Sequence, residues 1–171
     1  ETTELGVKSG FLDGRVTANV AAYHTDWSDL QQQIRLTGFP GSLCTAVLTA
    51  NVGTAEVDGV ELELAGLATD RLTLTGTVSY TDARIVDPGP GSALAKPGDT
   101  FPNVPEWSGS LMADYSVPTQ AFGGSTLFLH GDLRYMSETS PVVGQPANPQ
   151  LELPAYTLVG LRGGFTFGEN P

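Results

Sequence analysis

The chain has 171 residues, and its 19 aspartates and glutamates outnumber 8 lysines and arginines, giving a formal net charge of −11. This acidity argues against a nucleic-acid partner, because Lys and Arg are the residues that neutralise phosphates. No run of 18 apolar residues occurs, so a membrane-spanning helix is not expected. The one cysteine, Cys44, allows no disulfide within the chain, and it is interpreted as an unreactive thiol.

The first 25 residues predict a β-hairpin. Apolar and polar residues alternate over 4–11 and 15–25, and a period of two is typical of strands. Asp13-Gly14 between them is a strong signal for a two-residue hairpin turn. On one face this turn predicts the pairs Phe11–Val16, Ser9–Ala18, Val7–Val20 and Leu5–Ala22, and on the other Lys8–Asn19 and Glu4–Tyr23.

A second hairpin is predicted for residues 59–82, "GVELELAGLATDRLTLTGTVSYTD", which alternate twice around a break at 69–71. The apolar residues are even-numbered on both strands, so pairing them needs a loop with an odd number of residues. A three-residue loop at 69–71, with Asp70 in the left-handed position, satisfies this condition. It predicts the pairs Leu72–Ala68, Leu74–Gly66, Val78–Leu62 and Tyr80–Val60.

A third hairpin joins 105–117 to 125–138, and a last strand covers 154–167. The connections alternate in length: those at 12–14, 69–71 and 118–124 are short, whereas those at about 35–50, 86–104 and 139–152 are long. This regularity predicts an all-β fold, an antiparallel up-and-down meander of about seven strands. Short turns at one end and long loops at the other are typical of outer-membrane β-barrels.

The apolar faces share one length. Leu72 to Tyr80, Trp107 to Tyr115 and Leu127 to Tyr135 each span eight residues, or roughly 19 Å of height at a tilt near 45°. That height fits an apolar band of about 25 Å edged by aromatic residues. The ordinary core of a soluble sheet remains an alternative interpretation of the same pattern.

Four segments resemble the barrel of TonB-dependent outer-membrane receptors when taken in order. They are "ETTELGVKSGFLDGRVTANVAAYHTDWSDLQQQ", "NVGTAEVDGVELEL" followed by "DRLTLTGTVSYTDARI", "FPNVPEWSGSLMADYSVP" and "LPAYTLVGLRGGFTF". The resemblance implies a barrel of about 22 strands with an N-terminal plug domain and a segment that contacts TonB. It implies residence in the outer membrane and import of a small iron chelate, most often a ferric siderophore.

Under this resemblance residues 1–171 are expected to be a C-terminal part of the barrel, without the plug domain, the TonB-contacting segment and the final strands. Outer-membrane lipid and, through the parent receptor, TonB and the plug are the implied partners. The ligand is expected at the extracellular loops 35–50, 86–104 and 139–152. Lumen-facing candidates are Glu61, Glu63, Arg134 and Arg162, and lipid-facing candidates are Val60, Leu62, Leu72, Leu74, Val78, Tyr80, Leu129 and Leu133.

Other chemistries have weaker support, and neither a cofactor nor an enzymatic activity is expected. Glu61 and Glu63 lie about 6 to 7 Å apart along a strand, a spacing compatible with glycoside hydrolysis but more simply that of wall residues. His24 and His130 lack metal-ligand spacing, and the glycine-rich stretch 88–99 lacks the strand–loop–helix context of a phosphate site. The competing function is a small soluble barrel that binds an apolar ligand, as lipocalin-like proteins do.

Overall fold

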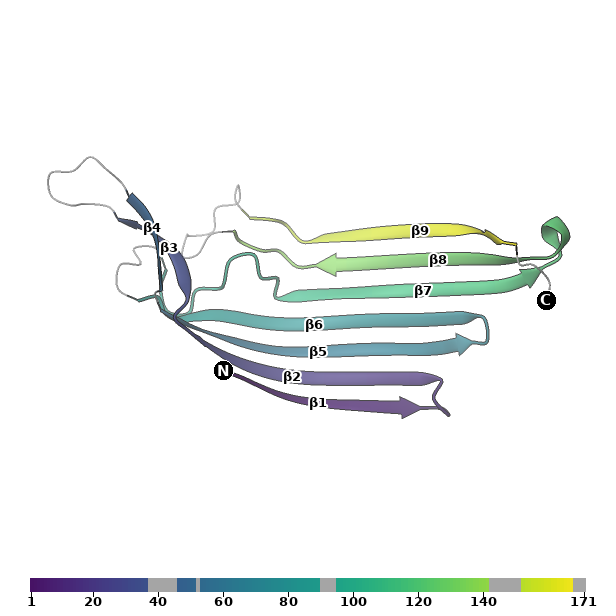
Figure 1. The fold of residues 1–171 in the computed structure, drawn as a ribbon, viewed down its shortest axis with the longest axis horizontal. Helices are drawn as coiled ribbons and strands as arrows, with labels where there is room; N and C mark the ends of the chain where they lie inside the picture. Colours follow the sequence, from purple (N-terminus) through teal and green to yellow (C-terminus); the bar gives the residue numbers. More distant parts are fainter. Residues whose placement is uncertain (37–45, 52, 90–94, 142–151, 168–171) are drawn as a thin grey trace.

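The computed structural model describes residues 1–36, 46–51, 53–89, 95–141 and 152–167. Seven strands form one antiparallel sheet in the order β1-β2-β5-β6-β7-β8-β9, and a separate two-stranded sheet is formed by β3 and β4 (Figure 1). The strands are β1 (Thr2–Phe11), β2 (Val16–Ser28), β3 (Gln31–Leu36), β4 (Ala46–Asn51), β5 (Thr54–Thr69), β6 (Leu72–Asp87), β7 (Trp107–Thr119), β8 (Ser125–Met136) and β9 (Tyr156–Thr166).

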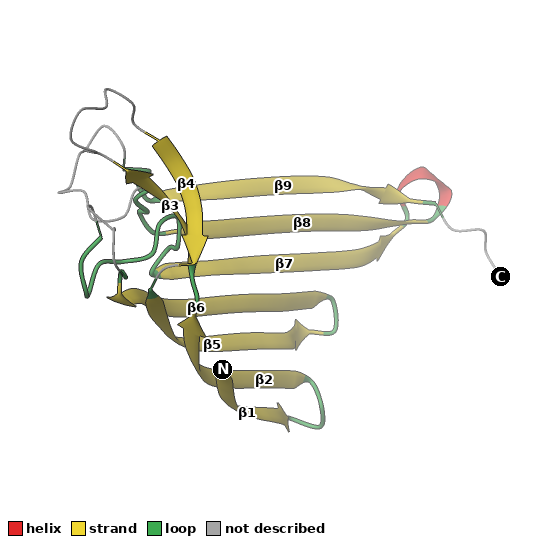
Figure 2. Ribbon diagram, turned by 60° about the vertical axis from the view of Figure 1, so that its left-hand side comes forward, coloured by secondary structure: helices red, strands yellow, loops and turns green. Residues whose placement is uncertain are grey.

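The predicted seven-stranded meander is confirmed, and the β3–β4 hairpin is an addition to it. Each strand of the large sheet pairs with its neighbour along the meander, always antiparallel. β3 and β4 flank the predicted connection at 35–50, where the sequence analysis placed no strands. Figure 2 shows this hairpin at the end of the sheet opposite the only helical turn of the described residues, the 3-10 turn at Ala121–Gly123. In the described part no helix is long and apolar enough to cross a membrane.

The register of the first hairpin is as predicted, with Phe11 opposite Val16 and Leu5 opposite Ala22. The predicted two-residue turn is wrong: the turn spans residues 12–15, and within it Gly14 N–H donates to Phe11 O at 3.1 Å and Arg15 N–H donates to Leu12 O at 3.1 Å. Hairpin turns whose twist matches the strands need positive φ, and here Leu12, Asp13 and Gly14 all adopt it.

The second hairpin follows the prediction until its turn. Val60–Tyr80, Leu62–Val78 and Gly66–Leu74 pair as expected, but Leu72 lies opposite Thr69 instead of Ala68. A register shift between Leu67 and Thr69 supplies the extra residue, so the turn itself contains only Asp70 and Arg71. The prediction of a left-handed backbone at Asp70 is therefore wrong. The bulge provides the extra residue that the predicted three-residue loop would have provided.

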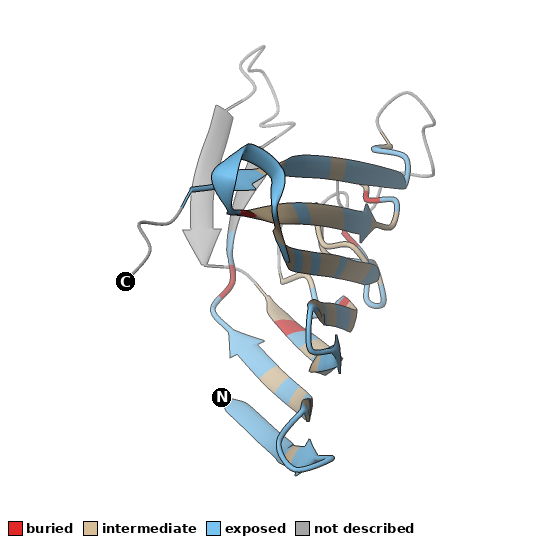
Figure 3. Ribbon diagram, turned by 90° about the vertical axis from the view of Figure 1, so that its right-hand side faces the viewer, coloured by how far each residue is buried: buried red, intermediate tan, exposed pale blue. Residues whose placement is uncertain are grey.

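The two ends of the sheet differ as the loop lengths predict. The three short turns lie at one end, and the described parts of the long connections lie at the other, beside β3–β4 (Figure 1). We call these the short-turn end and the long-connection end. Seen along the strands, the sheet is twisted and curved, and most of it is exposed or only half-buried (Figure 3).

The buried core of the described residues is small and lies at the long-connection end. It comprises Leu30, Ala55, Ala83, Ile85 and Ala95. Over the rest of the sheet large apolar side chains stay exposed, up to 86% at Leu161 and 77% at Leu5. A soluble barrel would enclose its apolar face, so the lipocalin-like alternative does not fit this arrangement.

Candidate functional site

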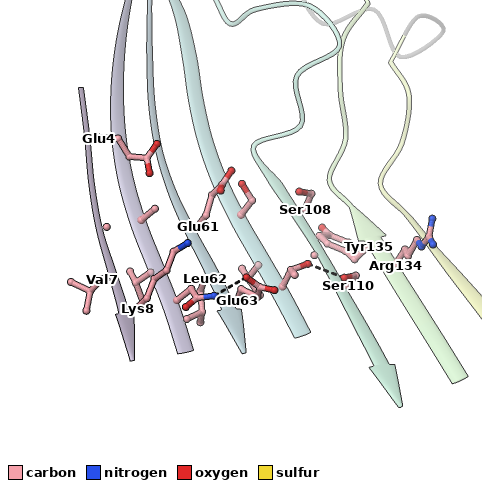
Figure 4. Close-up of a pocket in the computed structure, with 18 of the residues that line it drawn as sticks. Glu4, Val7, Lys8, Glu61, Leu62, Glu63, Ser108, Ser110, Arg134 and Tyr135 are labelled. Carbon is pink, nitrogen blue, oxygen red and sulfur yellow. Dashed lines mark hydrogen bonds between the residues drawn. The ribbon is translucent and has the colours of Figure 1, made fainter. Parts of the chain in front are cut away.

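Ten residues form a polar belt across six neighbouring strands, over a hollow of about 610 Å³ (Figure 4). Side chains of one strand alternate between faces, so residues that pair across the ladders share a face. One row follows the pairings Lys8–Asn19–Glu63–Thr77–Ser110–Arg134. The belt consists of Glu4, Lys8, Asn19, Glu61, Glu63, Thr77, Ser79, Ser108, Ser110 and Arg134.

Hydrogen bonds between strands fix three neutral members of the belt, Asn19, Thr77 and Ser110. Asn19 Nδ2 donates to Glu63 Oε2 at 3.0 Å, and the hydroxyls of Thr77 and Ser110 lie 2.8 Å apart. Among the described residues, Lys8, Glu61 and Arg134 make no ion pair and stay exposed. The belt thus presents fixed polar groups and open charges of both signs, which suits water or a polar partner rather than hydrocarbon.

A second polar group lies on the same face, nearer the short-turn end. His130 Nδ1 donates to Asp114 Oδ1 at 2.7 Å, while its Nε2 lies 3.6 Å from Asp132 Oδ1. Arg162 pairs in register with His130. The structure therefore brings Glu61, Glu63 and Arg134 together in the belt and places Arg162 apart from them.

The opposite face of these strands is apolar. The row that backs the belt runs Val7–Val20–Leu62–Val78–Gly109–Tyr135. Toward the long-connection end this face stops at Tyr80 and Trp107, whose rings pack at a centroid distance of 4.8 Å. All eight residues expected on the apolar side share this face, namely Val60, Leu62, Leu72, Leu74, Val78, Tyr80, Leu129 and Leu133.

Charged residues replace the apolar ones directly beyond the Tyr80–Trp107 pair. His24 Nδ1 donates to Asp58 Oδ1 at 2.8 Å, and its Nε2 lies 3.3 Å from Asp26 Oδ1. The hydrogen bond to Asp58, aided by the nearby Asp26 charge, raises the pKa of His24 above its usual 6.5. Hydrogen bonding to Asp82 at 2.7 Å likewise raises the pKa of the Arg84 guanidinium.

An aromatic stack lies at the long-connection end of the polar face. The rings of Trp27 and Phe101 are 5.9 Å apart and nearly parallel, at 14°. Phe101 is held beside β6 because its N–H donates to Ala83 O at 2.9 Å. Trp27 pairs in register with the buried Ala55, and half of the Trp27 side chain remains exposed. Nothing in the sequence indicated that these two aromatic residues meet.

The alternative chemistries find no support in the described part. Glu61 and Glu63 share a face as expected, but the groups that surround them are those of the belt. Neither His24 nor His130 belongs to a described group of three residues able to hold a metal ion. Cys44 and residues 90–94 of the stretch 88–99 lie outside the described residues, as do much of 35–50 and 142–151 of the expected ligand loops.

A family model for the β-barrel of TonB-dependent receptor-like proteins matches residues 1–170. The chain belongs to this family. The metal-pseudopaline receptor CntO of Pseudomonas aeruginosa is 31% identical over 98% of the chain, and the probable TonB-dependent siderophore receptor PiuA of Acinetobacter baumannii is 28% identical over 78% of it. TonB-dependent receptors are transporters of the outer membrane, not enzymes.

Solved structures of this family show the same fold. The siderophore receptor PiuA from Acinetobacter baumannii matches 99% of the chain with a TM-score of 0.71 at 23% identity. The ferric yersiniabactin uptake receptor FyuA from Yersinia pestis matches 94% with a TM-score of 0.72 at 17% identity. The chain spans about a fifth of these proteins, between 18% and 22% of their length.

Proposed function

We propose that this chain is a section of the wall of an outer-membrane transporter that imports an iron chelate, specifically a ferric siderophore, with energy from the TonB system. The family match over residues 1–170 carries the proposal. The names of two relatives, a siderophore receptor and a ferric yersiniabactin uptake receptor, support the choice of ligand class.

The two faces of the sheet contact different surroundings. The apolar face, including Val60, Leu62, Leu74 and Leu133, contacts lipid, and the polar belt with Glu61, Glu63 and Arg134 lines the lumen. A large barrel tolerates charges inside because its lumen holds water or protein. The belt charges that lack ion pairs in the described part are then available to the plug domain of the parent receptor.

Ligand contact belongs to the long-connection end, where the loops 35–50, 86–104 and 139–152 begin and end. The Trp27–Phe101 stack offers the ligand an exposed aromatic surface there. Trp107 provides a matched control, because it is similarly exposed, 46% against 50% for Trp27, but lies on the apolar face. Trp27→Ala should weaken chelate binding by the full receptor, and Trp107→Ala should leave it close to wild type.

Uptake of radiolabelled iron tests the whole proposal. Cells that depend on the full receptor should accumulate iron from at least one member of a ferric siderophore panel. Accumulation should stop when the receptor gene or the gene for TonB is deleted. Uptake that survives both deletions for every siderophore of the panel would refute the proposed function.

A further inference from the structure

The turn between β7 and β8 carries an exposed phenylalanine in an unfavourable backbone conformation. Phe122 has φ 54° and ψ 35°, the left-handed region that bulky L-residues avoid. Its side chain is 72% exposed, although Gly123 and Gly124 follow it directly and adopt positive φ without cost. In water most of this large apolar ring would stay in contact with solvent.

Hydrogen bonds hold the turn in this shape. Ala121 N–H donates to Thr119 Oγ1 at 3.2 Å, and the Ser125 hydroxyl, on a buried residue, donates to Ala121 O at 3.0 Å. Gly124 N–H donates to the same carbonyl at 3.3 Å. The position of the Phe122 ring is therefore set by its own turn, and the ring is not simply a loose surface side chain.

Phe122 meets one phenylalanine of β9, Phe165, and a second, Phe167, that directly follows the strand. Its ring packs edge-on against Phe165, at 5.1 Å and 74°, and against Phe167, at 6.1 Å and 75°. Phe165 pairs in register with Leu127, which in turn pairs with Val117, so it lies on the apolar face. The three rings extend this face at the short-turn end, where β8 begins, and stay 72%, 40% and 67% exposed for Phe122, Phe165 and Phe167.

The chemistry of these rings differs from that at the other end of the sheet. Tyr80 and Trp107 each carry a polar group, which suits the level of lipid head groups. Phe122, Phe165 and Phe167 carry none, which suits the acyl chains just inside the head groups. Backbone strain alone does not indicate lipid: Leu12 has φ 52° and the same 72% exposure, but its turn carries Asp13 and the Arg15–Asp70 ion pair of 2.9 Å.

We propose that the phenylalanine cluster, Phe122, Phe165 and Phe167, is buried in the acyl region of the inner leaflet, so that the β7–β8 turn is seated in the membrane. Burial of the Phe122 ring offsets the strain of its left-handed backbone. The inference rests on the proposed function, since it requires that the apolar face contact lipid.

Fluorescence quenching at single labelled cysteines tests this placement in the full receptor, reconstituted in phosphatidylcholine vesicles. Labels at positions 122 and 161 should lose fluorescence, by about twofold or more, to nitroxides on the acyl chains, with shallow nitroxides the more effective at position 122. Thr166 lies between Phe165 and Phe167 in the sequence but on the polar face, so a label there should respond to aqueous iodide instead. Quenching at position 161 but not at 122 would refute only the placement of the β7–β8 turn in the membrane. Absence of quenching at both positions would also refute the proposal that the apolar face contacts lipid.

A pair of glycine substitutions gives a second test that needs no label. Glycine relieves left-handed strain, so in water it should leave unfolding unchanged or slow it. In lipid the lost burial of a phenyl ring outweighs that relief, and Phe122→Gly should unfold about fivefold faster in vesicles. Leu12→Gly is the matched control and should unfold no faster than wild type. Equal acceleration of both variants, or of neither, would refute the burial of Phe122.

Discussion

Replacing Leu74 and Thr75 by arginine tests which face of the sheet meets lipid. The two residues are neighbours in β6 and point to opposite faces, Leu74 between Gly66 and Ala113 and Thr75 between Ala65 and Met112. An arginine on the lipid side loses water around its charge, whereas one on the lumen side keeps water or polar partners. Leu74→Arg should therefore be much more destabilising than Thr75→Arg.

The magnitude follows from depth. The apolar rows from Leu72 to Tyr80 cover roughly 19 Å, and the phenylalanine cluster extends this face beyond Leu72, so Leu74 lies near the middle of the apolar band. Arginine costs ~2–4 kcal/mol at the bilayer midplane and less toward the interfaces. Small neighbours at Gly66 and Ala113 give its long side chain room to reach toward the interface. We expect about 2 kcal/mol for Leu74→Arg, the low end of this range.

The measurement is the free energy of unfolding of the full receptor in lipid vesicles, for each variant separately. Two further positions calibrate depth: Leu133 pairs with Leu111 in the row of Gly76, and Leu129 pairs with Tyr115 in the row of Leu72. Both arginine variants should be destabilising by similar amounts, because each position lies one row from Leu74. Equal costs at Leu74 and Thr75, or a larger cost at Thr75, would show that the apolar face is an interior core.

Two other predictions concern single side chains. Gly59→Ala should lower the free energy of unfolding by roughly 1–3 kcal/mol, because its new Cβ would overlap the Tyr23 ring. Gly10→Ala should be nearly neutral, because its new Cβ meets nothing within 4 Å. Urea unfolding of both variants checks this, and equal costs would contradict it. Because the pKa of His24 is raised, the stability from its bond to Asp58 should be full below about pH 6.5 and be lost as pH rises through the folded-state pKa. The measurement is the difference in free energy of unfolding between wild type and His24→Gln. A difference that grows with pH would contradict the prediction.

The sequence was sufficient to predict the seven strands of the large sheet, their order and most of the register of the first two hairpins. Register could be predicted because a one-residue slip would move Val60, Leu62 and Leu64 to the face of Glu61 and Glu63. The error at Leu72 arose because an odd loop and a two-residue turn with a bulge satisfy the same alternation. The alternation of apolar and polar residues determines which residues share a face, but it does not distinguish between these two turns.

Contacts between distant segments could not be predicted in this way. Trp27 and Phe101 meet only because the segment after β6 folds back along that strand, and its hydrogen bonds follow no period in the sequence. The grouping of Glu63 with Arg134 in one belt required the pairings of three successive ladders. The contact of Phe122 with Phe165 required the actual shape of a turn. Local alternation carries no information about any of these.

The isolated 171-residue chain should associate in buffer without detergent. One whole face of its sheet leaves large apolar side chains in water, including Leu5, Val159 and Leu161 at 77%, 69% and 86% exposure. Its outermost strands, β1 and β9, also present unpaired backbone groups along one side each, and exposed strand edges promote pairing between chains.

Light scattering coupled to size-exclusion chromatography provides the measurement, with and without a mild detergent. Detergent should cover the apolar face and so reduce association, while a strand edge needs another strand to satisfy its donors and acceptors. We therefore expect large assemblies in plain buffer and smaller ones in detergent. A monodisperse monomer in plain buffer would mean that the chain encloses its apolar face, as the soluble-barrel alternative requires, and the assignment of that face to lipid would then fail.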